Sequence, residues 1–177
     1  MGLTYFRRYR MVADLSRHLN RPPEDIAGYT FVPYARRTLS DHGRAKAAGF
    51  EGEMDALVFE SLASRDGTTR LMREIASRNE FVAEATWLCR TTDGQPVATI
   101  QGMVQQNRGS IQNLSVTPEH RGRRIATELI HRAAAGFRSH RIATITLEVT
   151  AENQSAINLY LRLGFEIECV TYKLADL

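Results

Sequence analysis

An arginine-rich turn near the middle of the chain has the residue types and spacing of a phosphate-binding site. A strand-like segment ends at Pro118, and a helix-like segment starts a few residues later. The turn and the first helical residues are Arg121, Gly122, Arg123, Arg124, Ile125, Ala126 and Thr127. The first N–H groups of a helix have no partner within it, and the helix dipole adds partial positive charge there. This part of the sequence therefore predicts a site for a phosphate or pyrophosphate group.

Two further polar residues, Asn153 and Tyr160, lie seven positions apart in a helix-like segment. Seven residues make nearly two helical turns, so the two side chains point the same way and lie roughly 10 Å apart along the axis. One face of this helix can therefore line a long, thin ligand. The alternative is that Tyr160 is a core aromatic residue that packs near Ile157 and Leu163.

A carboxylate, Glu148, lies on the polar side of a predicted strand from Ala143 to Val149. Apolar and polar residues alternate along this segment, which is typical of a half-buried strand. Glu148 can accept a proton there, directly or through water. An alternative interpretation is a polar-face glutamate that pairs with a nearby arginine.

The segments that must position these residues can be predicted from their periodicity. Residues 35–48 and 68–78 are helix-like, and residues 5–15 fit either a strand or the start of a helix. Strands are predicted at 81–90 and 96–105, joined by a turn at Asp93-Gly94, and then at 110–116 after a turn at Gly109. A helix follows from residue 125, then the strand 143–149, a helix 153–163 that ends at Gly164, and a last strand 165–174. The order from residue 81 is hairpin, strand, helix, strand, helix, strand, which indicates an α/β (α+β) protein.

The chain has 177 residues, of which 43% are hydrophobic, so we expect one domain with a substantial core. No apolar run approaches the roughly 18 residues of a membrane span, and Met1 to Arg10 has no apolar signal core, so we expect a cytoplasmic protein with no membrane partner. Cys89 and Cys169 lack metal-ligand spacing, so we expect buried free thiols and no metal site. The net charge of +3, mostly from arginine, permits nucleic-acid binding without requiring it.

Together, these motifs resemble the GNAT superfamily of N-acetyltransferases over roughly residues 80 to 174. The family signature Arg/Gln-x-x-Gly-x-Gly/Ala is present from Arg121 to Ala126, but Arg124 stands where the middle glycine is usual. Because a residue in the first helical turn needs no positive φ, we expect Arg124 to keep helical geometry with its side chain turned outward. A weakened affinity for the cofactor is the alternative.

The resemblance implies the GNAT fold, a mixed central β-sheet with a splayed parallel strand pair and helices on both faces. It implies a single N-acetyltransferase domain over residues 1–177, with residues 1–80 on the acceptor side and 81–177 as the acetyl-CoA-binding core. The co-substrate is then acetyl-CoA, without a metal. The resemblance also permits a homodimer, since family members often dimerise.

The resemblance assigns roles to individual residues. The cofactor's pantetheine arm would pair with the backbone of Leu114, Ser115 and Val116, and its phosphates would bind the turn from Arg121 to Thr127. Asn153 would hydrogen-bond the arm, and Tyr160 would reach the thioester sulfur. A phenol is mostly protonated at neutral pH, so Tyr160 can give a proton to the departing thiolate.

The pattern Leu-Glu-Val-x-x-x-Asn is also similar to the ribosomal-protein alanine acetyltransferases, a branch in which the glutamate is the proposed general base. Glu148 matches that position, and the amine must lose a proton before it can attack. Glu84, in the strand 81–90, is a second candidate base. Neither cysteine lies beside a histidine in the sequence, which disfavours a route through a covalent acetyl-enzyme. We therefore expect direct acetyl transfer to a primary amine within a ternary complex.

The acceptor is not identified by the first 80 residues. A loose group of acids there could favour a cationic amine such as a polyamine, an aminoglycoside or a peptide N-terminus, or could form a solvated face. These acids are Glu51, Glu53, Asp55 and Glu60. Two other functions remain open: a GNAT-fold module that senses acyl-CoA without turnover, and a basic nucleic-acid-binding domain that uses residues 121–124, which is the less favoured of the two.

Overall fold

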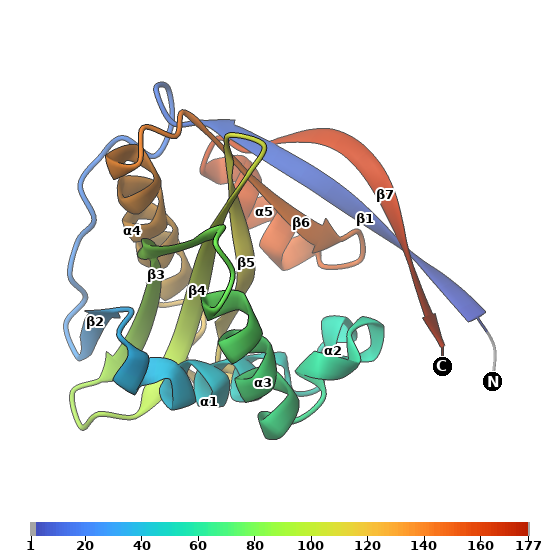
Figure 1. The fold of residues 1–177 in the computed structure, drawn as a ribbon, viewed down its shortest axis with the longest axis horizontal. Helices are drawn as coiled ribbons and strands as arrows, with labels where there is room; N and C mark the ends of the chain where they lie inside the picture. Colours follow the sequence, from blue (N-terminus) through green and yellow to red (C-terminus); the bar gives the residue numbers. More distant parts are fainter. Residues whose placement is uncertain (1–2, 177) are drawn as a thin grey trace.

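Seven strands form one sheet in the order β2-β3-β4-β5-β6-β1-β7, and all neighbouring strands are antiparallel except β5 and β6. The computed structural model describes residues 3–176 (Figure 1). The strands are β1 (Leu3–Asp14), β2 (Tyr29–Pro33), β3 (Phe81–Thr91), β4 (Pro96–Gln105), β5 (Arg108–Val116), β6 (Thr144–Thr150) and β7 (Glu166–Asp176). The open choice for residues 5–15 is thereby settled as a strand.

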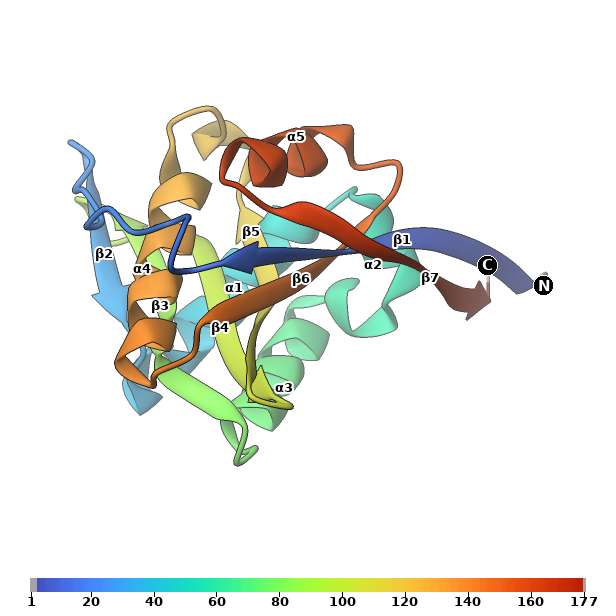
Figure 2. The same cartoon turned by 90° about the horizontal axis from the view of Figure 1, so that it is seen from above.

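Helices cover both faces of this sheet. The α-helices are α1 (Leu39–Phe50), α2 (Met54–Val58), α3 (Arg65–Ala76), α4 (Ile125–Ser139) and α5 (Gln154–Arg162), and the 3-10 turns are η1 (Arg36–Thr38), η2 (Glu60–Leu62) and η3 (Pro118–His120). Figures 1 and 2 show α1 and α3 on one face of the β3–β5 region and α4 on the other. The mixed sheet, its parallel pair and the helices on both faces confirm the predicted fold class. In residues 3–176, no helix is long and apolar enough to cross a membrane.

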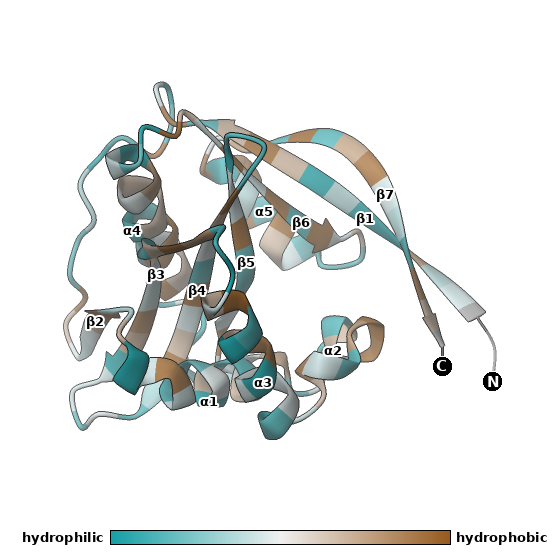
Figure 3. Ribbon diagram, in the orientation of Figure 1, coloured by the Kyte–Doolittle hydropathy of each residue, from teal (hydrophilic) through white to brown (hydrophobic). Residues whose placement is uncertain are grey.

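An apolar stripe along α4 lies in the core. Ile125, Leu129, Ala133 and Phe137 are each at most 1% exposed. They recur every four residues, so they share the helix face that packs on the sheet. Figure 3 shows the corresponding hydrophobic stretches on β3 and β4.

The turn between β4 and β5 differs from the sequence-based prediction, which placed it at Gly109. The turn is made by Gln106 and Asn107, whose φ angles of 50° and 61° suit a tight hairpin. Gly109 lies within β5, where an added Cβ would come within 2.8 Å of Ile145 and 2.9 Å of Phe137. The glycine therefore serves close packing of β5 against β6 and α4.

A layer of polar side chains is buried between α1 and β4. His42 and Lys46 lie one helical turn apart and are fully buried. His42 Nδ1 is 2.7 Å from Thr99 Oγ1, but within residues 3–176 neither His42 Nε2 nor Lys46 Nζ has a hydrogen-bond partner. Burial lowers the pKa of Lys46 to about 7, and burial, Lys46 and Arg90 lower the pKa of His42 to about 3.

We expect Lys46 to make stability depend on pH above neutrality. The unfolded chain holds the Lys46 proton up to a pKa of about 10.4, whereas the folded chain loses it near pH 7, so stability rises with pH across that window. Each pH unit there adds at most about 1.4 kcal/mol, so the free energy of unfolding should increase by about 2 kcal/mol between pH 7 and pH 9.

Urea unfolding at both pH values checks this, with a Lys46→Met variant. The variant should lose the increase, whereas Lys173→Met, at the exposed second lysine, should keep it. An unfolding free energy of the unmodified protein that is equal at pH 7 and pH 9 would contradict the account.

Candidate active site

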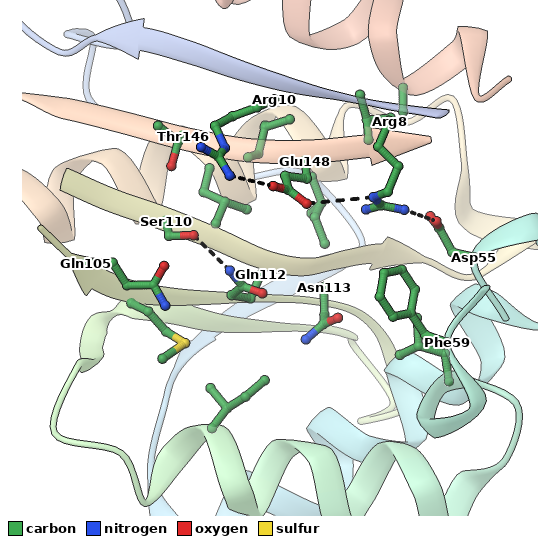
Figure 4. Close-up of a pocket in the computed structure, with 18 of the residues that line it drawn as sticks. Arg8, Arg10, Asp55, Phe59, Gln105, Ser110, Gln112, Asn113, Thr146 and Glu148 are labelled. Carbon is green, nitrogen blue, oxygen red and sulfur yellow. Dashed lines mark hydrogen bonds and ion pairs between the residues drawn. The ribbon is translucent and has the colours of Figure 1, made fainter. Parts of the chain in front are cut away.

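A cleft of about 810 Å³ runs along β5 and β6 beneath β1, with α3 and the α2–η2 segment opposite (Figure 4). Its walls come from segments far apart in the sequence. Glu148 on β6 lines it together with Asn153 and Tyr160 of the α5 region. The structure therefore brings the predicted carboxylate, amide and phenol to one cavity.

The cleft exists because β5 and β6 separate. They are paired only at Gly109 with Ile145 and at Ser110 with Thr146. Both strands continue beyond that point, β5 to Val116 and β6 to Thr150, without pairing to each other. The facing edges thus leave backbone N–H and C=O groups available to an extended ligand.

The three β5 residues predicted to meet the pantetheine arm occupy different environments. Leu114 lines the cleft, and Ser115 is buried on the other side, where it packs closely against Gly49 of α1. The Val116 carbonyl accepts a hydrogen bond from Arg121 Nε at 3.0 Å. A bulge at Asn113, whose φ is 52°, breaks the regular pairing with β4 just before these residues.

The arginine-rich turn differs from the prediction at Arg124. This residue has φ 65° and ψ 7°, which is left-handed, and α4 starts only at Ile125. The expectation of ordinary helical geometry at Arg124 was therefore wrong. The position requires the positive φ that glycine adopts at little cost, and Arg124 adopts it although it has a side chain.

The same turn leaves a row of backbone N–H groups without partners. Among residues 3–176, none of the N–H groups from Gly122 to Thr127 is hydrogen-bonded within the protein, and Glu128 makes the first helical bond, to the Arg124 carbonyl, at 3.0 Å. These groups lie at the positive end of a 15-residue helix. The turn can therefore bind an anion through its backbone.

The arginine side chains of the turn are largely engaged elsewhere. Arg121 donates to Glu53 at 2.7 Å and to the Gly49 carbonyl at 3.1 Å, which ties the turn to the α1–α2 connection. Arg124 donates to Glu24 at 3.2 Å. In the described part of the chain, Arg123 has no ion pair or hydrogen bond, so its guanidinium is the one available to a ligand.

The α5 helix places Asn153 and Tyr160 as the spacing predicts. Asn153 is the N-cap of α5, and its Oδ1 accepts a hydrogen bond from the Ala156 N–H at 3.1 Å. This bond uses only the oxygen of the amide, so the amide nitrogen can still donate into the cleft. Tyr160 is 8% exposed and lies against Phe165, with ring centroids 5.8 Å apart.

Tyr160 is thus both a core residue and a cleft residue. Burial first, and then the charge of Asp55, raise the pKa of its hydroxyl well above the usual value. The phenol therefore keeps its proton through the whole physiological pH range.

Glu148 is held by two arginines of β1. Arg10 Nη2 donates to Glu148 Oε1 at 3.1 Å, and Arg8 Nε lies 3.8 Å from Oε2 (Figure 4). Arg8 also donates to Asp55 at 2.9 Å and to Thr150 at 2.7 Å. The carboxylate therefore pairs with arginine, as one interpretation held, and also lines the cleft, as the other requires.

Glu84, the second candidate base, lies outside the cleft. Its Oε2 is 2.9 Å from His140 Nε2 at the end of α4, and the side chain is exposed. Hydrogen bonds, first with its own backbone and then with His140, lower the pKa of the Glu84 carboxyl. An irregularity of β3 between Val82 and Trp87 interrupts the strand pairing at the position of Glu84.

Several residues of the cleft were not predicted from the sequence. The charged ones are Arg8, Arg10, Arg78 and Arg108. The alternation of Arg8 and Arg10 with Tyr9 and Met11 was the available signal, since it places both arginines on one face of a strand. In residues 3–176, no group of three or more His, Cys, Asp or Glu side chains could hold a metal ion.

Comparison with known proteins identifies a family whose model matches most of this chain. The family model of the acetyltransferase (GNAT) family matches residues 55–165. A GCN5-related N-acetyltransferase structure from Sphaerobacter thermophilus superposes with a TM-score of 0.68 at 23% identity, over 98% of this chain and 52% of that one. This chain thus spans about half the length of that protein.

Two shorter proteins match over nearly their whole length. The ribosomal-protein-S18-alanine N-acetyltransferase of Escherichia coli has a TM-score of 0.63 at 15% identity, over 84% of this chain and 95% of that one. A GCN5-related N-acetyltransferase from Ralstonia eutropha has a TM-score of 0.57 at 29% identity, over 77% of this chain and 92% of that one. At 15% identity, the likeness to the Escherichia coli protein concerns the fold alone.

Proposed function

The chain belongs to the GNAT acetyltransferase family, and on that premise we propose that it moves an acetyl group from acetyl-CoA to a primary amine by direct attack in a ternary complex. One observation carries the proposal: Glu148 and Tyr160 line the same cleft, beside the gap between β5 and β6. We propose further that residues 1–177 act as one domain, with the acceptor bound mainly by the part before residue 81.

Acetyl-CoA would bind along the gap between the two strands. Its pyrophosphate would accept hydrogen bonds from the N–H groups between Gly122 and Thr127, and Arg123 would add charge. The pantetheine arm would pair with β5 and receive a hydrogen bond from Asn153. The proposed cofactor residues are Leu114, Ser115, Val116, Arg121, Gly122, Arg123, Arg124, Ile125, Ala126, Thr127, Asn153 and Tyr160.

The proposed chemistry needs a base and an acid. Glu148 would accept a proton from the ammonium, directly or through water, so that the neutral amine can attack the thioester carbon. The tetrahedral intermediate then collapses, the C–S bond breaks, and the thiolate takes the Tyr160 proton. The nitrogen loses its second proton in the same step, and this proton, directly or through water, restores the phenol. Burial raises the pKa of the Cys89 thiol to about 12, which makes that thiol a poor nucleophile and supports transfer without an acetyl-enzyme.

Calorimetric titration with acetyl-CoA tests the cofactor assignment. We expect saturable binding, and about tenfold weaker binding for Ala126→Glu, because a carboxylate at this helix N-terminus repels the pyrophosphate. Ser139→Glu, at the opposite end of α4, should bind as the unmodified protein does. A protein that binds no acetyl-CoA at millimolar concentration would contradict the proposal.

A further inference from the structure

Positively charged side chains outnumber negatively charged ones in the lining of the cleft. Four arginines and two carboxylates line it. Asp55 is paired with Arg8, and Glu148 with Arg10. Two positive charges remain among the lining residues, those of Arg78 and Arg108.

Neither of these two arginines is firmly neutralised. Within residues 3–176, Arg78 makes no ion pair, and it is exposed. Arg108 donates two hydrogen bonds to the carboxylate of Glu168 on β7, at 2.8 Å and 3.4 Å, and about a third of each side chain is exposed. Water screens such a partly exposed pair, so an incoming anion can compete with Glu168 for Arg108.

The strand register places both arginines at the same end of the cleft. Gln105 pairs with Arg108 across the β4–β5 turn, and the Val104 N–H donates to the Glu80 carbonyl at 2.7 Å. The turn after α3, which contains Arg78, therefore lies beside the β4–β5 turn. Gln105 and Gln106 line this end as well.

The proposed acetyl-transfer site lies further along the same strands. Ser110 pairs with Thr146 in parallel register, so Glu148 lies near the level of Gln112, four residues beyond Arg108. Four strand residues span roughly 13 Å, and the long arginine side chains shorten the distance that a ligand must bridge. An amine beside Glu148 and an anion beside Arg108 can thus belong to one small molecule.

The wall between these two points is partly apolar. Met103 of β4 pairs with Ser110 of β5, between Arg108 and Gln112, and Leu71 and Ile75 of α3 also line the cleft. Uncharged groups of a ligand would contact these side chains, whereas a second ammonium group would meet Arg78 and Arg108.

On the basis of the proposed function, we propose that the acceptor amine also carries an anionic group, a carboxylate or a phosphate, which Arg78 and Arg108 bind at the end of the cleft away from Tyr160. Both oxyanions accept paired hydrogen bonds from a guanidinium. The acids of the N-terminal half do not oppose this. Glu53 is bonded to Arg121 and Asp55 to Arg8, while Glu51 and Glu60 do not line the cleft. Polyamines and aminoglycosides are therefore poor candidates.

Acceptors matched in length test the proposal. Coenzyme A release is measured with 6-aminohexanoate, 6-aminohexyl phosphate, 6-aminohexanamide and 1,6-diaminohexane. Their reacting amines are alike, because the far group is too distant to change the amine pKa much. Binding of each compound to the enzyme–coenzyme A complex is measured as well, so that a ranking exists even for an amine that reacts slowly.

We expect one or both of the anionic compounds to have a KM or Kd about tenfold lower than the amide, and the diamine to be the poorest ligand. Whichever of 6-aminohexanoate and 6-aminohexyl phosphate has the lower KM or Kd identifies the preferred anionic group as a carboxylate or a phosphate.

Substitutions at Arg78 connect the preference to this residue. Arg78→Gln should raise the KM or Kd of the preferred anionic compound about tenfold and leave that of the amide unchanged, and Arg78→Glu should favour the diamine. Arg73→Gln, on an exposed position of α3 outside the cleft, should change neither.

An amide or diamine that binds as well as the anionic compounds would overturn the inference. So would an Arg78→Gln variant that affects all acceptors equally. In both cases acetyl-CoA would still bind, and the proposed function would stand. Failure of the proposed function would instead show itself as a protein that does not bind acetyl-CoA at all.

Discussion

Replacing Tyr160 by phenylalanine should lower kcat about 100-fold and leave the affinity for acetyl-CoA nearly unchanged. General acids contribute about that factor or more, and the phenylalanine keeps the packing against Phe165. In residues 3–176 the Tyr160 hydroxyl makes no hydrogen bond to the protein, so its removal breaks no internal network. Steady-state kinetics and calorimetry measure the two quantities.

The matched control for this substitution is Tyr172→Phe, which removes the hydroxyl of an exposed tyrosine of β7. Its kcat should equal that of the unmodified enzyme. Because burial raises the pKa of Tyr160, the unmodified enzyme should also retain its acid, and hence its kcat, up to about pH 10. An unchanged kcat in Tyr160→Phe would remove this tyrosine as the proton donor.

Replacing Glu148 by glutamine should also lower turnover about 100-fold near neutral pH, with acetyl-CoA affinity unchanged. Glutamine is similar in shape but cannot take the proton of an ammonium. The deficit should shrink as the pH rises towards the pKa of the amine, about 10.4 for a lysine-like acceptor, since the neutral amine then exists without a base. The measurement is the ratio of kcat/KM of the unmodified enzyme to kcat/KM of Glu148→Gln, determined as a function of pH.

A structural role of Glu148 would give a different result. The carboxylate bonds Arg10 and lies near Arg8, so its loss could simply disturb β1. In that case the deficit would be independent of pH, and thermal unfolding would reveal a lower Tm. Glu166→Gln, at an exposed position of β7, is the control and should match the unmodified enzyme at every pH.

The second half of the fold is predictable from the sequence because its signals are local. Alternation along residues 144–150 and the four-residue spacing from Ile125 to Phe137 each describe one element against the core. Asn153 and Tyr160 share a helix, so their common orientation follows from helical geometry alone. These elements carry the predicted base, acid and anion-binding turn.

Contacts between distant segments could not be predicted in this way. Arg10 meets Glu148 across 138 positions of sequence, and only the pairing of β1 with β6 brings them together. The charge surplus at Arg78 and Arg108 likewise depends on which carboxylates are already paired. The positive φ of Arg124 was missed for another reason: the prediction placed Arg124 in the first helical turn, whereas α4 begins at Ile125 and Arg124 is its left-handed N-cap, where the glycine of the family signature would fit at little cost.

Acetyl-CoA labelled with ¹³C in the acetyl group tests the central claim most directly. The enzyme is incubated with labelled acetyl-CoA and an amine acceptor, and the label is located by mass spectrometry of the small molecules and of the intact protein. We predict that the label appears as an amide on the acceptor, that unacetylated coenzyme A is released in equal amount, and that the protein remains unlabelled. Label that is found on the protein, or only in free acetate, would contradict direct transfer to an amine.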